Sequence, residues 1–220
     1  MDKTIVADSS SIISLAVNCM SSVLGELGVK VVVTGEIYDE IVSRPMNSKR
    51  YSLESLRIRK LFSEGVISVV EPDPFVVKDI LETSNSIYRI GRHNLRLIHG
   101  GEAAALALMK EESREVLLID ERTTRMLVED AEELCKVLCD QTAYRVVMDT
   151  ERLGHFRSIV PDIKIIRSSE VAAVAYEKGI LSRNLGSKGK EVFASVLYAL
   201  KFSGCAISWQ EIEDYVRALS

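Results

Sequence analysis

Short apolar runs rich in β-branched residues alternate with longer helical patterns along this chain, and this alternation constrains its fold more than any other feature. Runs typical of strands occur at residues 4–7, 29–33, 66–70, 116–119 and 163–166. Strands separated by helices pair in parallel through right-handed crossovers, which place helices on both faces of the sheet. The pattern therefore predicts an α/β protein, a three-layer α/β/α sandwich with a central parallel sheet.

The segments between these runs have the apolar spacing of helices. We expect helices over residues 12–27, 34–42, 53–62, from Phe75, over 102–110, from Thr123, over most of the stretch up to Pro161, and over 169–178. Thr34 is a candidate N-cap, and Pro45 a stop signal for the helix that follows it. Residues 183–190 are basic and rich in glycine, which indicates a loop or hinge. Two helices close the chain, and the second begins with a capping box, Ser208-Trp-Gln-Glu211.

The composition excludes several broad classes. The chain has 220 residues with 28 Lys and Arg and 32 Asp and Glu, so its formal charge is −4. This charge argues against a strongly basic protein that wraps nucleic acid, although binding depends on local patches of charge and not on the net charge.

No apolar run approaches the roughly 18 residues of a membrane span. The uncharged stretch 9–25 is interrupted by Ser and Asn, so we expect no signal peptide and no membrane association. Four cysteines without a CxxC pair predict buried thiols in a reducing cytoplasm.

Several motifs of common catalytic sites are missing from the sequence. There is no GxGxxG, GxxxxGK[ST], HExxH or GxSxG, and the three histidines lack the spacing of metal ligands. These absences argue against a dinucleotide cofactor, a P-loop, zinc proteolysis and serine hydrolysis.

Acidic side chains follow two of the expected strands. Asp8 ends the first strand and Asp120 ends the fourth. In parallel α/β sheets, ligands bind beyond the carboxyl ends of the strands, where the strand order reverses. If these two strands are neighbours, both carboxylates face one crevice. An acid at the end of a strand is equally often a helix cap or a turn former.

Two glutamates in expected helices extend this acidic set. Glu40 lies at the edge of the expected core-facing side of its helix. Glu102 begins a helix on the same stripe as Leu106 and Met109, where a carboxylate needs a partner or a cation; the alternative is a first-turn Glu that complements the helix dipole. Four converging carboxylates would repel one another unless they held hard divalent cations such as Mg²⁺ or Mn²⁺. A pair of such ions clamps the attacking and leaving oxygens in phosphodiester cleavage.

Four segments, in this order, resemble the motifs of the PIN-domain nucleases. They are Val6-Ala7-Asp8-Ser9-Ser10, residues 33–42 with Glu40, residues 100–108 with Glu102, and residues 117–122 with Asp120. The resemblance covers about residues 1–180. It implies a PIN-like, Rossmann-like sheet in the order 3-2-1-4-5 and a Mg²⁺- or Mn²⁺-dependent endoribonuclease that hydrolyses RNA by a two-metal-ion mechanism, leaving 5′-phosphate and 3′-hydroxyl ends.

The resemblance also carries roles onto individual residues. It implies catalytic and metal-binding roles for Asp8, Glu40, Glu102 and Asp120, and a supporting role for the hydroxyl of Ser10. Family members often have a second Asp directly after the fourth-strand acid. Here that position is Glu121, whose longer side chain we treat as supporting.

Basic residues near these acids are candidates for RNA binding. They are Arg44, which follows the expected Glu40 helix, and Arg89, Arg92, His93 and Arg96 in the acid-free stretch 83–101. Their charges would hold the RNA backbone, and Tyr88 would stack a base. The alternative is a solvated loop and helix face.

Two other functions stay open at this point. An aspartyl phosphotransferase or phosphatase would use Asp8 as its nucleophile, although Ser9 stands where a second alternating Asp would begin that motif. A non-catalytic RNA-binding or scaffold module would have the same fold, although it would gain nothing from four clustered acids.

The expected domain organisation is a nuclease-like domain at residues 1–180 and a helical extension at 181–220 packed on it. Trp209 and Tyr215 on the last helix predict packing onto the body or onto a second subunit of a homodimer. A toxin with an antitoxin-like partner and a stand-alone RNA-processing enzyme are equally open.

Overall fold

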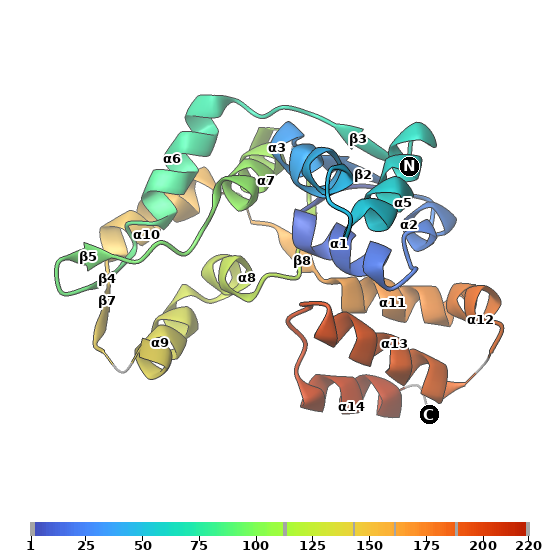
Figure 1. Cartoon of the computed structure of the whole chain (residues 1–220). Helices are drawn as coiled ribbons and strands as arrows, with labels where there is room; N and C mark the ends of the chain where they lie inside the picture. The colour runs from blue at the N-terminus through green and yellow to red at the C-terminus, as the bar shows by residue number, and fades with distance from the viewer. Residues whose placement is uncertain (1–2, 112–113, 143, 161, 188, 219–220) are drawn as a thin grey trace.

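A parallel five-stranded sheet forms the centre of the computed structural model, which describes residues 3–111, 114–142, 144–160, 162–187 and 189–218 (Figure 1). The strand order is β3-β2-β1-β6-β8. The strands are β1 (Lys3–Ala7), β2 (Val29–Val33), β3 (Ile67–Val69), β6 (Val116–Leu118) and β8 (Lys164–Ile166). Counted along the chain, these are the five expected strands, so the order 3-2-1-4-5 is confirmed.

The inner strands β2, β1 and β6 carry buried apolar side chains because helices cover the sheet on both sides. Val6 lies opposite Val32 of β2 and Leu117 of β6, and all three are buried. Continuous β-branched runs are typical of such strands, since neither face meets water.

Helices alternate with these strands along the first 180 residues. They include α1 (Ser9–Val17), α2 (Ser22–Glu26), α3 (Gly35–Tyr38), α4 (Arg44–Met46), α5 (Ser52–Ser63), α6 (Pro74–Ser84), α7 (Gly100–Glu111), α8 (Arg122–Glu129) and α11 (Ser168–Glu177). A central parallel sheet flanked by helices is the expected fold class.

The single helix expected over residues 12–27 is wrong. Helix α1 ends at Val17, and Cys19 adopts a left-handed conformation with φ of 58°. The Met20 nitrogen then donates to the Leu15 carbonyl at 2.8 Å. This closure is a Schellman motif, which satisfies the last carbonyls of a helix and turns the chain away from its axis.

The helix expected over residues 34–42 continues beyond its expected stop. Thr34 caps α3 through its hydroxyl, which accepts from the Ile37 nitrogen at 3.4 Å. A π-helical turn, η1 (Asp39–Ser43), follows, and Pro45 lies inside α4 rather than ending the helix. Pro45 is tolerated because it lies in the first turn of a new helical segment, where no intrahelical donor is needed.

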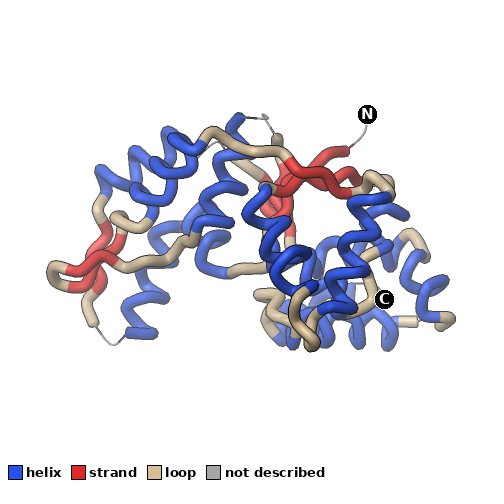
Figure 2. Tube along the Cα trace, turned by 45° about the horizontal axis from the view of Figure 1, so that its top comes forward, coloured by secondary structure: helices blue, strands red, loops and turns tan. Residues whose placement is uncertain are grey.

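A second, antiparallel sheet was not expected from the sequence. Its order is β5-β4-β7, formed by β4 (Tyr88–Ile90), β5 (His93–Asn94) and β7 (Val146–Met148). Strand β7 interrupts the stretch expected to be mostly helical, between α9 (Ala131–Thr142) and α10 (Thr150–Ile159). Pro161, the expected end of that stretch, lies outside the described residues. Figure 2 shows the small sheet as a group of strands separate from the main sheet.

Three helices follow the last strand of the main sheet and α11. They are α12 (Ile180–Leu185), α13 (Lys190–Phe202) and α14 (Trp209–Ala218). Helix α12 extends through residues 183–185 of the loop expected at 183–190, and Lys188 lies outside the described residues. The capping box of α14 is confirmed, with Ser208 and Glu211 bonded reciprocally at 2.7 and 3.0 Å. Across the described residues, no helix is long and apolar enough to cross a membrane.

Candidate active site

Two aspartates lie beyond the carboxyl ends of the neighbouring strands β1 and β6. The Asp8 nitrogen donates to the Leu118 carbonyl at 2.9 Å, and the Asp120 nitrogen donates to Ser10 Oγ at 3.4 Å. Both aspartates are buried. Because β1 and β6 pair in parallel, both acids lie at the same edge of the sheet.

Asp8 combines a structural task with an unfavourable electrostatic environment. It is the N-cap of α1, and its Oδ2 accepts from the Ser10 nitrogen at 3.0 Å. Burial raises the pKa of Asp8 above its usual value, and this effect outweighs the hydrogen bonds from Ser10 and Ser9. The negative charge of Glu121 raises the pKa further. A nearby cation would remove both costs of ionising this group.

Glu102 faces Asp8 from the first turn of α7. Its Oε2 accepts from the His99 nitrogen at 2.9 Å, so the side chain folds back over the start of the helix. Burial is the main cause that raises the pKa of Glu102, and the charge of Asp8 adds to it. The two carboxyl groups come from different elements, and the charge of Asp8 opposes ionisation of Glu102.

The glutamates of α3 and η1 lie close to the two glycines at the start of α7, and only at Gly100 would an added Cβ be too close. A Cβ on Gly101 would lie 3.9 Å from Glu40 Oε2, and a Cβ on Gly100 would lie 2.7 Å from Glu36 Oε1. Glu40 is exposed and not at the edge of a core-facing side as expected, because η1 changes the register of the helix one residue before it. Turns of π-helix are frequent at functional sites.

Asp120 points its carboxylate at the start of α11. Its Oδ1 accepts from the Ser168 nitrogen and its Oδ2 from Ser168 Oγ, each at 2.7 Å. The next residue, Glu121, is the N-cap of α8 and accepts from the nitrogens of Thr123 and Thr124 at 2.7 and 2.6 Å. Each of these two acids therefore holds a helix start, and Glu121 also lies close enough to affect Asp8.

Comparison with known protein families gives one match, to a family model described as a PIN domain, over residues 4–132. The chain belongs to the PIN domain family. PIN domains are generally nucleases, so the fold is that of a nuclease-type family. Neither the search of curated proteins nor that of solved structures gave a match.

The acids of this PIN domain do not form a ready-made metal cluster. Among the residues that the structure describes, no three His, Cys, Asp or Glu side chains are arranged so that they could hold a metal ion. Asp8 and Glu102 are electrostatically coupled, Glu40 lies against Gly101, and Asp120 is engaged by Ser168. The donor set nevertheless fits a hard divalent cation, since carboxylate oxygens are its preferred ligands and the cation would offset the coupling of Asp8 with Glu102.

The basic residues expected to bind RNA lie at differing distances from these acids. Arg96 lines a pocket of about 400 Å³ together with His99 and Gly100, at the start of α7. Arg89, Arg92 and His93 belong to β4, β5 and the turn between them, in the small sheet at one end of the molecule (Figure 1). Arg44 begins α4 and, like the other four, is exposed.

Tyr88 cannot stack a base as expected, because it is buried and its hydroxyl donates to the Ala131 carbonyl at 2.7 Å.

The sequence interpretation missed Ser168 as a partner of the site. The Ser-Ser pair after the fifth strand was a weak signal, since small hydroxyl residues at the start of a helix are usually read as caps. Ser168 is fully buried, and β8 with α11 lies beyond the family match.

Proposed function

We propose that this PIN domain is a Mg²⁺- or Mn²⁺-dependent endoribonuclease whose metal ligands are Asp8, Glu40, Glu102 and Asp120. Ser10 and Glu121 support them. The observation that carries the proposal is the pair of Asp8 and Glu102, two half-buried or buried carboxyl groups from separate elements whose pKa values are raised by burial and whose charges repel. Two such carboxyl groups cost free energy when both are charged, so their placement together favours a role in binding a cation over a role in stability.

The residues of the chain divide the work at this site. A bound divalent cation would supply Lewis acidity and neutralise charge at the scissile phosphodiester. Asp8 and Glu102 would hold it from two sides, with Glu40 reaching in past Gly101. Ser10 orients Asp8 through its backbone nitrogen, while Ser168 fixes Asp120 through both oxygens. Glu121 keeps a second negative charge near Asp8.

We assign the RNA backbone first to Arg96, because it lines a pocket at the start of the helix that carries Glu102. Arg44 is a second candidate contact. Arg89, Arg92 and His93 would contact only a longer RNA that extends to the small sheet. The domain boundary that we propose, 1–180 with an extension at 181–220, follows from the fact that β8 and α11 complete the sheet beyond residue 132.

The test is cleavage of a single-stranded RNA by three variants of the full chain. Asp8→Asn and Glu102→Gln keep the hydrogen-bonding shape of the side chain but remove its charge. We expect each to lower the cleavage rate about 100-fold or more, since even residues that only support a metal ligand cost up to that factor. Asp39→Asn is the matched control, because Asp39 is an exposed acid on the same turn as Glu40 and bonds Ser43.

Calorimetric titration with Mn²⁺ completes the test. The wild-type chain should bind the ion, and Asp8→Asn should bind it more weakly. Normal RNA cleavage by Asp8→Asn in the presence of a chelator would refute the proposal. Absence of divalent binding would favour a scaffold, and a trapped phosphoryl group on Asp8 would favour the phosphotransferase class.

A further inference from the structure

A pocket of about 600 Å³ lies between the start of α8 and the loop that joins α13 to α14. Three basic side chains line it, Arg122 and Arg125 from α8 and Lys201 from α13, together with the aromatic rings of Phe202 and Trp209. Most of the lining residues follow residue 200 and so lie outside the PIN-domain match. The pocket is therefore a property of this chain's extension, where it meets the nuclease domain.

The charges that line the pocket are positive and incompletely paired. Among the described residues, no ion pair engages Arg122, and Arg125 reaches only Glu129, through an Nε–Oε2 distance of 3.9 Å. The Arg125 Nε has no hydrogen-bond partner in the part of the chain that the structure describes.

One acid, Glu211, also lines the pocket, but its Oε1 lies 2.9 Å from Arg167 Nη1. Arg167 also pairs with Glu170, so it offsets the charge of Glu211 only in part. The three basic side chains still outnumber the one acid of the lining, which leaves the pocket a positive potential that attracts an anion.

The aromatic rings beside these cations are open to solvent. Phe202 is 79 % exposed and Trp209 53 % exposed. Their rings meet edge to face with centroids 5.8 Å apart, and Lys201 Nζ lies 4.8 Å from the centre of the indole. Exposed aromatic rings next to basic groups are the combination on which single-stranded nucleic acids bind, because a base can stack while phosphates meet the cations.

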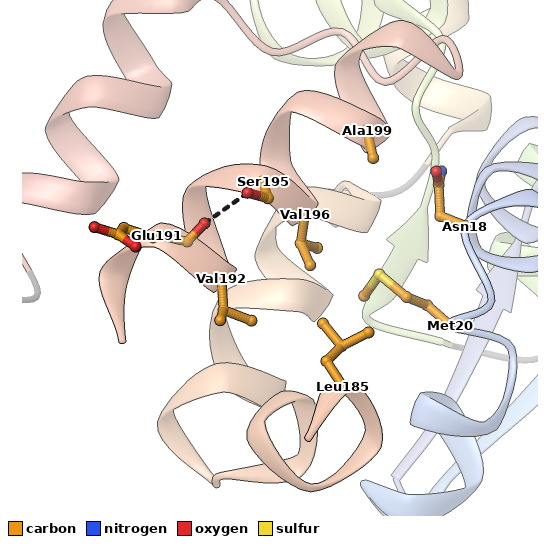
Figure 3. Close-up of a pocket in the computed structure, with 8 residues that line it drawn as sticks. All are labelled: Asn18, Met20, Leu185, Glu191, Val192, Ser195, Val196 and Ala199. Atoms are coloured by element: carbon orange, nitrogen blue, oxygen red, sulfur yellow. Dashed lines mark hydrogen bonds between the residues drawn. The ribbon is translucent and has the colours of Figure 1, made fainter. Parts of the chain in front are cut away.

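A second pocket, where the extension meets Asn18 and Met20, provides a contrast. Its volume is about 400 Å³, and Met20, Leu185, Val192 and Val196 are among the residues that line it (Figure 3). Its lining includes no basic side chain that would attract a phosphate. The basic and aromatic lining is thus specific to the α8 pocket and not a general feature of the extension.

The α8 pocket adjoins the acidic edge of the main sheet. The Ala206 nitrogen, in the wall of the pocket, donates to the Asp120 carbonyl at 3.2 Å. Arg122 directly follows Glu121, the residue whose charge acts on Asp8. A nucleic acid strand bound in the pocket would therefore lie close to the part of the protein that carries Asp120 and Glu121.

We propose that this pocket is a subsite for single-stranded RNA. A nucleobase stacks on Phe202 and Trp209, and the adjoining phosphates contact Arg122, Arg125 and Lys201. The proposal rests on the proposed nuclease function, to which it adds a place where the strand is held outside the carboxylate centre.

Trp209 is the only tryptophan of the chain, so its fluorescence reports on this pocket without a label. The experiment uses the full-length Asp8→Asn protein, in which cleavage is expected to be slow, and a short oligouridylate. We expect the RNA to quench the tryptophan emission with a saturable, salt-sensitive dependence. A double-stranded RNA of the same length should quench it much less, because its bases are not free to stack.

Two substitutions test the two kinds of contact separately. Phe202→Ala should weaken oligouridylate binding about five-fold or more, and Arg122→Ala should weaken binding and lower the salt slope by about 0.7. The matched controls are Phe75→Ala, since Phe75 is 82 % exposed on α6, and Arg59→Ala on α5, which is also exposed. Both controls should bind as the parent does, and anisotropy of a labelled oligouridylate measures all four.

The outcomes separate this proposal from the nuclease proposal. Quenching with weakened binding by Phe202→Ala and Arg122→Ala supports the subsite, whether or not the wild-type chain cuts RNA. The subsite proposal is overturned, and the nuclease proposal stands, if the wild-type chain cleaves RNA while Trp209 emission stays unchanged and both variants bind RNA normally.

If the chain neither binds nor cleaves RNA, both proposals are overturned. A concentration-dependent shift of Trp209 emission without RNA would identify a second copy of the chain as the occupant and also overturn the subsite.

Discussion

Ser168 determines where the carboxylate of Asp120 points. Asp120 and Ser168 are 48 positions apart, yet both carboxylate oxygens of Asp120 accept from Ser168, one from its nitrogen and one from its hydroxyl. Both residues are almost completely buried. A buried carboxylate with too few donors costs free energy, so the hydroxyl is more than a local cap.

Ser168→Ala should therefore destabilise the protein. It removes one hydrogen bond to a buried charged group, which is worth about 1–3 kcal/mol in the free energy of unfolding. Ser14→Ala is the matched control, because Ser14 is also buried but its Oγ has no hydrogen-bond partner within the described residues. Urea unfolding followed by circular dichroism measures both. Equal losses in the two variants would contradict the role assigned to the Ser168 hydroxyl.

At the scale of elements, the sequence predicts best where one physical cause dominates. Strand β2 spans residues 29–33, as expected, because a parallel strand buried on both faces is a continuous β-branched run. The capping box of α14 was predicted for a similar reason, since its two residues lie three positions apart, and α7 begins two residues before its predicted start. Three of the four acids proposed as metal ligands stand out in the sequence for a similar reason, because Asp8 and Asp120 follow strands and Glu102 lies in the first turn of a helix; their role as ligands stays a prediction.

Elements that depend on distant partners could not be predicted in this way. Strand β4 pairs Tyr88 with Met148 of β7, 60 positions later, and each of these strands has three residues. Three residues carry too little periodicity to indicate a strand before the partner is known. The direction of the Asp120 carboxylate was hidden for the same reason, because it is set by where α11 begins.

A cluster of charges connects three elements and gives the fold a predictable response to acid. Arg167, at the end of β8, pairs with Glu170 of α11 at 2.6 Å and with Glu211 of α14 at 2.9 Å. Burial of Glu170 by itself would raise its pKa, but hydrogen bonds from Arg167 and Tyr215 outweigh burial and lower it. Burial likewise opposes the lowering of the Glu211 pKa, which Ser208 and Arg167 bring about.

Lowered carboxyl pKa values stabilise the fold above the pKa of the unfolded chain and stop doing so as the pH falls through the folded value. The free energy of unfolding should therefore decrease as the pH falls below about 4.3, the ordinary value for Glu. Glu170→Gln should reduce this decrease, and Glu177→Gln, an exposed acid on the same helix, should leave it unchanged. Urea unfolding at pH 7 and near pH 4 measures the difference. The same acid response in both variants would exclude Glu170 as its source.

At the scale of the whole molecule, the C-terminal extension is joined to the PIN domain by both core packing and charge. Phe193 of α13 is fully buried and stacks on Tyr176 of α11 with ring centroids 4.9 Å apart. Tyr215 of α14 meets Phe193 edge to face at 6.3 Å and donates to Glu170 at 2.7 Å. The Ala206 nitrogen reaches Asp120 itself. These contacts link the extension to the end of the strand that carries a proposed metal ligand.

The extension and the sheet should consequently unfold as one unit. Phe193→Ala removes a fully buried ring and should lower the free energy of unfolding by about 3–5 kcal/mol. Trp209 reports on the extension and far-ultraviolet circular dichroism on the whole chain, so the two signals should give coincident urea transitions in the wild-type chain and in Phe193→Ala. Phe75→Ala, at an exposed position, should leave the transition where it is. A Trp209 transition that moves alone to lower urea would mean that α13 and α14 detach from a PIN domain that stays folded. Since Ala206 donates to Asp120 and Glu211 pairs with Arg167, we expect instead that loosening the extension also loosens the carboxyl edge of the sheet.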